Sequence, residues 1–306
     1  MKLIGIFALA LGASLHAAEA EAHARIAAAE KRLMEAAALA DREFDAWADK
    51  LPEGPSTLAP TGASADFALD AVLVGATPNS AGDGLAAKVR GNPLLVDGHT
   101  GKALRLDRES GMHVLENAGF RTSDSFTFSL WLRTSEPTGA IFRDDLRGIA
   151  LRLAKGRAIF AMSGLASLSV KVQPTPKQWT HFAVSYDGSN RPAGMRIYVD
   201  GVERPMDTRA EPKWKTSEGQ GIQLGFGLRG TVDEFRIFPR RLAPVEVAAL
   251  AGRDDFTKAV QSIPDLTPPQ RVALLEFYIA TAHDASRTAR EELRVARERY
   301  GETTTR

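Results

Sequence analysis

The chain has 306 residues, of which 44% are apolar and 25% are charged, a balance typical of globular proteins with a substantial core. Its 39 Lys and Arg residues against 38 Asp and Glu residues leave a formal charge of +1, which argues against a dedicated nucleic-acid-binding protein. The sequence contains no cysteine, which excludes disulfides, thiolate metal sites, cysteine nucleophiles and covalent c-type haem attachment within it.

Residues 1–20 have the features of a secretory signal peptide. One positive charge at Lys2 precedes the apolar run Leu3–Leu15, and small residues follow. We expect cleavage after Ala18 or Ala20, the alternative being an N-terminal amphipathic or buried helix. No later run approaches about 18 apolar residues, so we expect no transmembrane segment in the mature chain and a secreted or periplasmic location.

Residues 21–50 consist largely of Ala, Glu, Arg and Lys without Gly or Pro, which predicts an amphipathic helix. Its apolar seam repeats every seven residues at Ile26, Leu33, Ala40 and Trp47. Such a seam needs a partner, which is either another chain or a helix at the far end of this one. Prolines and glycine at 51–63 then predict a linker.

From residue 64 the pattern changes to short strands separated by turn residues. Regular strands without helical periods between them favour an antiparallel sandwich over a βαβ fold. The clearest hairpin turn is Asp200-Gly201, since a type I′ turn needs positive φ at both central positions. The predicted strands are 67–69, 94–96, 103–106, 126–133, 139–142, 149–153, 158–162, 167–172, 180–186, 195–199, 221–225 and 231–238.

Five phrases follow one another in a fixed order within this region. They are Gly101–Leu104, Phe126–Arg133, Trp179–Gly188, Arg196–Gly201 and Gly230–Phe238. The ordered set resembles the laminin-G-like, concanavalin-A-like jelly-roll family. The resemblance implies a mainly β protein, in which an antiparallel jelly-roll β-sandwich at 64–242 is flanked by N- and C-terminal α-helices.

The segment 243–306 is predicted to be helical, with helices near 244–250, 267–282 and 285–300. We expect the last of these to pair with the N-terminal helix or, alternatively, to form an exposed tail. The phrase Phe277–Thr281 with Arg290–Leu293 resembles the helical link after the laminin-G-like insert of large secreted proteins of planctomycete and verrucomicrobial type. Those proteins carry cytochrome-c-like segments, but the C-x-x-C-H haem motif is absent from this sequence.

Candidate ligand-binding residues lie on the outward positions of the strands. Alternation along 126–133 sends Trp131 and Arg133 away from the core, where Trp131 offers a stacking platform for a sugar ring and Arg133 offers donors. The alternative is that Trp131 packs against a neighbouring strand or loop. Arg143 and Arg152, with other arginines nearby, favour an acidic polysaccharide or are ordinary surface residues.

The resemblance also implies a possible calcium site, because some laminin-G-like domains bind calcium through rim oxygens. Asp144, Asp145, Asp187 and Asn190 supply oxygens of this kind, although their spacing specifies no complete set of ligands. The six histidines are scattered without metal-ligand spacing. We therefore hold calcium as the one cofactor to be tested.

The same superfamily contains glucanases, whose E-x-D-x-E strand is absent from this sequence. Asp107 and Glu109 form an i, i+2 acidic pair at an expected strand end, and the adjacent Asp233 and Glu234 are expected to point to opposite faces of their strand. We therefore expect a secreted, non-catalytic module that recognises a glycan or a protein surface, with helices mediating self- or hetero-association. A divergent glycosidase and a structural scaffold without a tight ligand are the alternatives.

Overall fold

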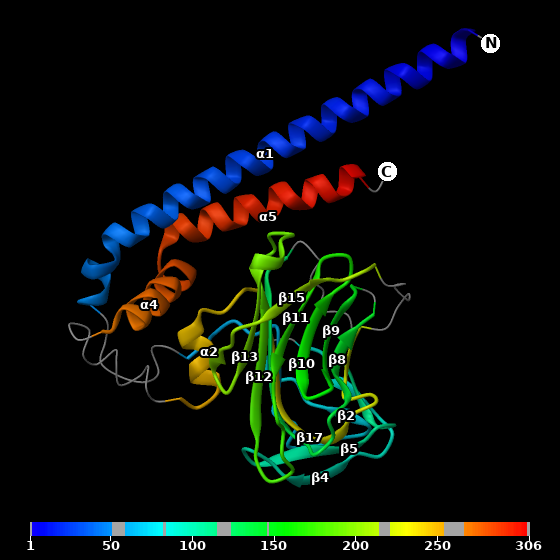
Figure 1. Cartoon of the computed structure of the whole chain (residues 1–306), viewed down its shortest axis with the longest axis vertical. Coiled ribbons are helices and arrows are strands. Elements are labelled where there is room, and N and C mark those ends of the chain that lie inside the picture. The colour runs from blue at the N-terminus through cyan, green and yellow to red at the C-terminus, as the bar shows by residue number, and fades with distance from the viewer. Residues whose placement is uncertain are drawn as a thin grey trace. The chain divides into compact units, whose positions relative to one another are not determined.

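The computed structural model describes residues 2–50, 59–81, 84–114, 124–145, 147–213, 221–253 and 266–304, and side chains from residue 18 to residue 300 within them. The chain divides into two compact units (Figure 1). One unit consists of residues 1–52 and 266–306, and the other consists of residues 53–265. Most of the predicted linker, 51–58, lies outside the described residues.

The first unit is helical and contains α1 (Lys2–Ala48), α4 (Pro268–Thr281) and α5 (Asp284–Thr304). α1 spans both the predicted signal peptide and the predicted helix at 21–50. α1 and α5 run antiparallel, since the His23 and Tyr300 rings lie 4.7 Å apart and Arg32 pairs with Glu292 at 2.7 Å. The seam of α1 thus packs on a helix from the far end of the same chain, which was one of the two partners expected.

Aromatic side chains fill the junction between α1 and α4. The Trp47 and Tyr278 ring centroids are 4.6 Å apart, and Phe44 is fully buried beside them. A capping box between Thr267 and Gln270 satisfies backbone groups at the start of α4. None of the helices, over the part of the chain that the structure describes, has the length and apolar character needed to cross a bilayer.

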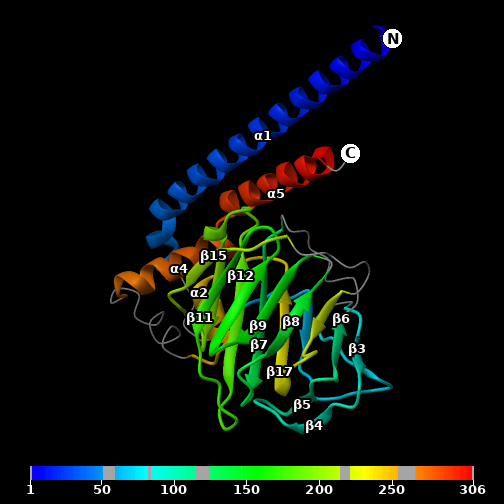
Figure 2. The ribbon, with the colours of Figure 1, turned by 45° about the vertical axis from the view of Figure 1, so that its right-hand side comes forward.

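The second unit is a sandwich of two antiparallel sheets (Figure 2). Sheet A has the order β14-β13-β12-β7-β17-β5-β4, with β1 also paired to β17. Its strands are β1 (Ala65–Phe67), β4 (Leu94–Asp97), β5 (Lys102–Asp107), β7 (Phe126–Arg133), β12 (Thr180–Tyr186), β13 (Met195–Val199), β14 (Val202–Glu203) and β17 (Arg229–Phe238).

Sheet B has the order β15-β11-β10-β9-β8-β16-β6-β3-β2. Its strands are β2 (Ala76–Thr77), β3 (Ala87–Arg90), β6 (Gly111–Val114), β8 (Gly139–Asp144), β9 (Ile149–Ala154), β10 (Arg157–Met162), β11 (Ala166–Lys171), β15 (Asp207–Ala210) and β16 (Ile222–Leu224). The predicted antiparallel sandwich with flanking helices is confirmed. Strands β2, β3, β6, β14 and β15 were not expected.

The core lies between the two sheets and follows the alternation of the strands. Phe126, Phe128, Leu130 and Leu132 of β7 point inward and are buried. The rings of Phe128 and Phe142 stack across the core with centroids 4.4 Å apart. The short helix α2 (Pro244–Leu250) packs Val247 on the outer face of sheet A, against Tyr198 and Phe238. Part of that outer face is therefore buried as well.

Candidate functional site

A β-bulge interrupts the central strand β17 of sheet A. The pairing of β17 with β7 shifts register between Asp233 and Arg236, and Glu234 has the left-handed φ of 50°. β5 pairs with β17 up to Val232, and β1 pairs with it from Phe235. The bulge therefore occupies the boundary between two strands that share one edge of β17.

The bulge corrects the expectation that Asp233 and Glu234 point to opposite faces. Asp233 is opposite Trp131 in register, and Glu234 Oε2 lies 3.4 Å from Arg236 Nη1. Arg236 is opposite Ser129, so all these side chains reach the outer face of sheet A. Simple alternation fails because the bulge inserts an extra residue into the strand.

Asp233 ties the β4–β5 loop to the sheet. Its buried carboxylate accepts the backbone N–H groups of His99 at 2.7 Å, Thr100 at 3.1 Å and Glu234 at 2.8 Å. Burial raises the pKa of Asp233 to about 6, although the three backbone donors act in the opposite direction. This carboxylate thus organises a loop, and both of its oxygens are already engaged.

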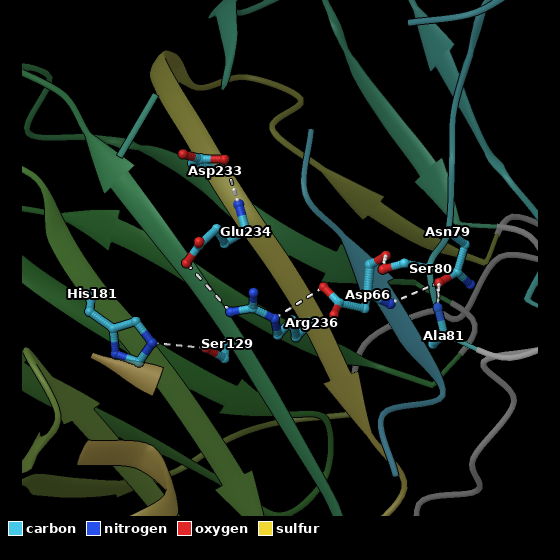
Figure 3. A network of polar contacts seen from close by, with 9 residues as sticks. All are labelled: Asp66, Asn79, Ser80, Ala81, Ser129, His181, Asp233, Glu234 and Arg236. Carbon is cyan, nitrogen blue, oxygen red and sulfur yellow. Dashed lines mark hydrogen bonds and ion pairs between the residues drawn. The ribbon is translucent and has the colours of Figure 1, made fainter. Parts of the chain in front are cut away.

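Arg236 links β17 to β1 on the same face, as Figure 3 shows. Its guanidinium bonds to Asp66 Oδ1 at 3.0 Å, besides its contact with Glu234. Nearby, His181 Nε2 lies 2.8 Å from Ser129 Oγ. Burial and the positive charge of Arg236 lower the pKa of His181 to about 3, so its ring is neutral at physiological pH. These groups form an internally paired polar layer.

Trp131 lies beside that layer and is 8% exposed. The His99 imidazole stacks on it, with ring centroids 3.7 Å apart and planes 13° apart. Arg133 lies over the Trp179 ring at 4.6 Å and donates to the Asp97 carbonyl at 3.2 Å. Trp131 thus has the packing that was the alternative to an open platform, and its role in binding stays a prediction.

The outer face of sheet B carries a row of basic and small side chains. Register aligns eight residues across it, namely Lys88, His113, Gln223, Arg143, Ala150, Ala161, Ser167 and Arg209. Arg152 lies two residues from Ala150, and Arg90 lies two residues from Lys88, so both share this face. Sheet pairing therefore brings the predicted Arg143 and Arg152 together with cations that were not predicted.

Most of these cations have no anionic partner. Arg143 pairs with Asp145 at 3.2 Å, and Arg157 pairs with Asp207. Among the described residues, no ion pair or hydrogen bond engages the side chains of four exposed basic residues, Lys88, Arg90, Arg152 and Arg209. Burial, together with the charges of Arg90 and Arg143, lowers the pKa of His113. The outer face of sheet B therefore carries an excess of positive charge on both sides of a row of small side chains.

The four predicted calcium ligands lie in two places. Asp144 and Asp145 end β8 in sheet B, whereas Asp187 and Asn190 follow β12 in sheet A. Arg147 donates to both oxygens of the buried Asp144, at 3.1 Å and 2.6 Å. Within the described ranges no group of three or more His, Cys, Asp or Glu residues is placed to hold a metal ion.

Asp187 and Asn190 belong to the β12–β13 connection, which contains the 3-10 helix η3 (Pro192–Gly194). Asp187 Oδ1 accepts the Ser189 backbone N–H at 2.9 Å, and its Oδ2 lies 3.6 Å from Arg241 Nη1. The Asn190 backbone N–H donates to the Tyr186 hydroxyl. These contacts stabilise a turn, and whether calcium binds here stays a prediction.

The acidic pair at the end of β5 is held by its own loop. Asp107 Oδ1 accepts the Ser110 hydroxyl at 2.7 Å and the backbone N–H groups of Ser110 at 2.9 Å and Glu109 at 3.2 Å. Hydrogen bonds from Ser110 lower the pKa of Asp107 below its ordinary value. A general acid needs a raised pKa, so this carboxylate suits a turn better than glycoside hydrolysis.

Comparison with known proteins gives one family match. Residues 107–248 match the family model described as the concanavalin A-like lectin/glucanases superfamily. No curated protein matches the chain significantly.

Several solved structures are similar to part of this chain. One of them is domain 4 of AbnA, a GH43 extracellular arabinanase from Geobacillus stearothermophilus, in complex with arabinotriose. It is 21% identical to this chain, with a TM-score of 0.47, and the match covers 62% of this chain and 98% of that chain. The binding domain of Paraclostridial Mosquitocidal Protein 1 is 16% identical with a TM-score of 0.48 over 62% of this chain. The receptor-binding domain of botulinum neurotoxin mosaic serotype C/D is 14% identical with a TM-score of 0.46 over 62% of this chain. The matches span 52% and 50% of these two toxin chains.

Proposed function

Because the sandwich of this chain is a concanavalin A-like domain, we propose that the protein is a non-catalytic binding module that recognises an acidic polysaccharide. The observation that carries the proposal is the outer face of sheet B, where exposed cations without anionic partners surround small side chains. Arginine presents paired donors that match a carboxylate, and the residues aligned between Arg143 and Arg209 have small side chains.

The arrangement of the acidic residues favours binding over hydrolysis. Asp233 is buried, and three backbone N–H groups already use its carboxylate. Glu234 faces the Arg236 guanidinium, and Asp107 is fixed by Ser110. A glycosidase needs two carboxyl groups that flank one bond in an open cleft, and none of these three residues has that setting.

Binding to immobilised polygalacturonate tests the proposal, with a neutral glucan as the comparison ligand. We expect retention of the wild-type chain on polygalacturonate alone, weakened by salt because exposed charges are screened. Arg143→Ala and Arg152→Ala should each reduce affinity about tenfold, since a hydrogen bond to a charged group contributes about 1.5–3 kcal/mol. Arg204→Ala removes the same charge from an exposed loop position outside sheet B and is the matched control.

Equal losses in all three variants would indicate attraction by net charge alone and contradict a site on sheet B. Repeating the assay with calcium and with a chelator tests the predicted ligands Asp144, Asp145, Asp187 and Asn190. Release of a polysaccharide product by the wild-type chain would instead favour the divergent glycosidase. Retention on neither ligand would favour the structural scaffold.

The proposal includes export of the protein. His23, Glu30 and Arg32 of α1 contact α5, and cleavage after Ala18 or Ala20 would leave these contacts in the mature chain. Mass spectrometry of the protein from the native envelope should find an N-terminus at Glu19 or Glu21. Helix-mediated association with another chain is a separate proposal, which the mass of the mature protein in solution tests.

A further inference from the structure

A cavity of about 580 Å³ lies on the outer face of sheet A, where β4, β5, β17 and β7 meet. This volume falls within the range of about 300–1,000 Å³ that is usual for small-molecule sites. Three arginines line the cavity, namely Arg105, Arg133 and Arg229. We call it the arginine pocket, and its lining belongs entirely to the sandwich unit.

Strand register fixes how the three arginines are placed. Arg105 of β5 and Arg133 of β7 lie opposite Thr231 of β17 from its two sides. Arg229 precedes Thr231 by two residues on β17 and therefore shares its face. The three arginines thus lie around Thr231 on the outer face of sheet A, although 124 positions separate Arg105 from Arg229 in the sequence.

The protein compensates only part of the positive charge of the pocket. Among the described residues, no ion pair or hydrogen bond engages the exposed side chains of Arg105 and Arg229. Arg133 contacts the Trp179 ring and the Asp97 carbonyl, and its charge also acts on the Asp97 carboxylate. Like charges held this close repel one another, so an anion in the pocket would be favoured.

The nearby carboxylates are engaged elsewhere. Asp107 lines the pocket opposite Arg229, but Ser110 and the adjoining backbone bond to one of its oxygens. The Asp97 carboxylate pairs with Lys102 at 2.9 Å. Three arginines against the one lining carboxylate therefore leave the pocket positive.

Other residues that line the pocket are apolar. Leu94 is opposite Arg105 in register and is 54% exposed. Val96 and Pro176 also line the cavity. A ligand that fits both parts needs an anionic group and a compact face of C–H groups, which a sugar ring bearing a carboxylate provides.

We propose that the arginine pocket binds a single hexuronate unit, either free or within a chain. Arg105 and Arg229 would take the carboxylate, and the ring would lie on Leu94. The site lies on the sheet opposite the polysaccharide face proposed above and shares no residue with it, so either proposal can fail alone. Arg133 is already oriented by Trp179, so its donor geometry is set before the ligand arrives.

Calorimetric titration of the full chain with D-glucuronate and with trigalacturonate tests the proposal, with glucose as the uncharged control. We expect saturable binding of at least one of the two uronates and none of glucose. In an Arg143→Ala, Arg152→Ala background, which removes the site proposed on sheet B, Arg105→Ala and Arg229→Ala should each weaken that binding about tenfold or more, whereas Arg204→Ala should leave it unchanged. Arg105→Lys keeps the charge but loses the paired donors, and should bind more weakly than wild type.

Binding of trigalacturonate without glucuronate would identify the polymer as the source of the uronate. Binding of neither, or an equal loss in Arg204→Ala, would overturn the proposal. Sulfate that binds as tightly as the uronates would also overturn it, since the pocket would then recognise charge alone. Because Arg133 covers Trp179, ligand binding should change tryptophan fluorescence, and Trp179→Phe should remove that signal.

Discussion

The ion pair that fixes α2 to the sandwich gives the sharpest test of the fold. The Glu246 side chain is 1% exposed and accepts hydrogen bonds from Arg240 Nη1 at 2.8 Å and Nη2 at 2.6 Å. It also accepts the Ala243 backbone N–H at 2.9 Å, which caps the helix. Glu246→Gln keeps the volume, but its NH₂ group cannot accept from the guanidinium, and the Arg240 charge loses its counter-ion.

The expected cost follows from burial. Removing one partner of a buried ion pair costs about 3–5 kcal/mol, because an uncompensated charge stays out of water. Arg240 is 26% exposed, so water recovers part of that cost. We therefore expect Glu246→Gln to lower the free energy of unfolding of the sandwich by about 2–3 kcal/mol.

Urea unfolding followed by tryptophan fluorescence measures this free energy. Trp47 belongs to the helical unit, so a Trp47→Phe background confines the signal to the tryptophans of the sandwich unit. Asp145→Asn is the matched control, since Asp145 pairs with Arg143 at 3.2 Å with side chains 31% and 46% exposed. That substitution should cost less than about 1 kcal/mol. An equal loss of unfolding free energy in Glu246→Gln and Asp145→Asn would refute the statement that burial makes the Glu246 ion pair more important than the exposed one.

Three further outcomes are expected. Burial raises the pKa of Asp233 from an ordinary 3.8 to about 6, so the folded state binds the proton more tightly than the unfolded state. The free energy of unfolding of the sandwich, measured with urea, should therefore fall as the pH rises from about 4 to about 6. Asp233→Asn should remove this dependence on pH. Phe44→Ala should destabilise the helical unit by about 3–5 kcal/mol, whereas exposed Met34→Ala should change it by less than about 0.5 kcal/mol, both measured by thermal circular dichroism. In denaturant unfolding, Glu234→Gly should give a more stable protein than Glu234→Ala, by about 1 kcal/mol.

The sequence predicts the helices and strands in which apolar residues recur at one regular spacing. Along Phe126–Arg133, alternation places the four apolar side chains in the core as the structure does. The seven-residue repeat of α1 identifies its buried seam, but it cannot say which helix covers the seam. That partner, α5, lies more than two hundred residues away, and only tertiary packing selects it.

The unexpected strands lack such a pattern. All four residues of Gly111–Val114 are buried, and all four residues of Asp207–Ala210 are exposed, so neither strand alternates. Their pairing comes from neighbouring strands rather than from their own composition. His113 and Arg209 of the basic row lie on these two strands, which is why sequence reasoning found Arg143 and Arg152 but missed the rest of the face.

The bulge in β17 follows from two strands that share one edge. β5 ends its pairing at Val232 and β1 begins at Phe235, so an extra residue between them can leave the ladder without breaking either pairing. The left-handed backbone there costs a residue with a Cβ about 1–2 kcal/mol. The contact of Glu234 with Arg236 at 3.4 Å is partly exposed and offsets less than about 1 kcal/mol of that cost.

Glycine and alanine at position 234 both lack the contact with Arg236, and they differ mainly in backbone strain. Glycine normally destabilises a strand relative to alanine, by roughly 0.5–1 kcal/mol. Glycine removes the strain at the observed φ of 50°, so the order should reverse here. The usual order would mean that the strand is extended at 234 in solution. Asp233 and Glu234 would then point to opposite faces of the strand, as simple alternation expects, and Glu234 would lose its contact with Arg236 on the outer face.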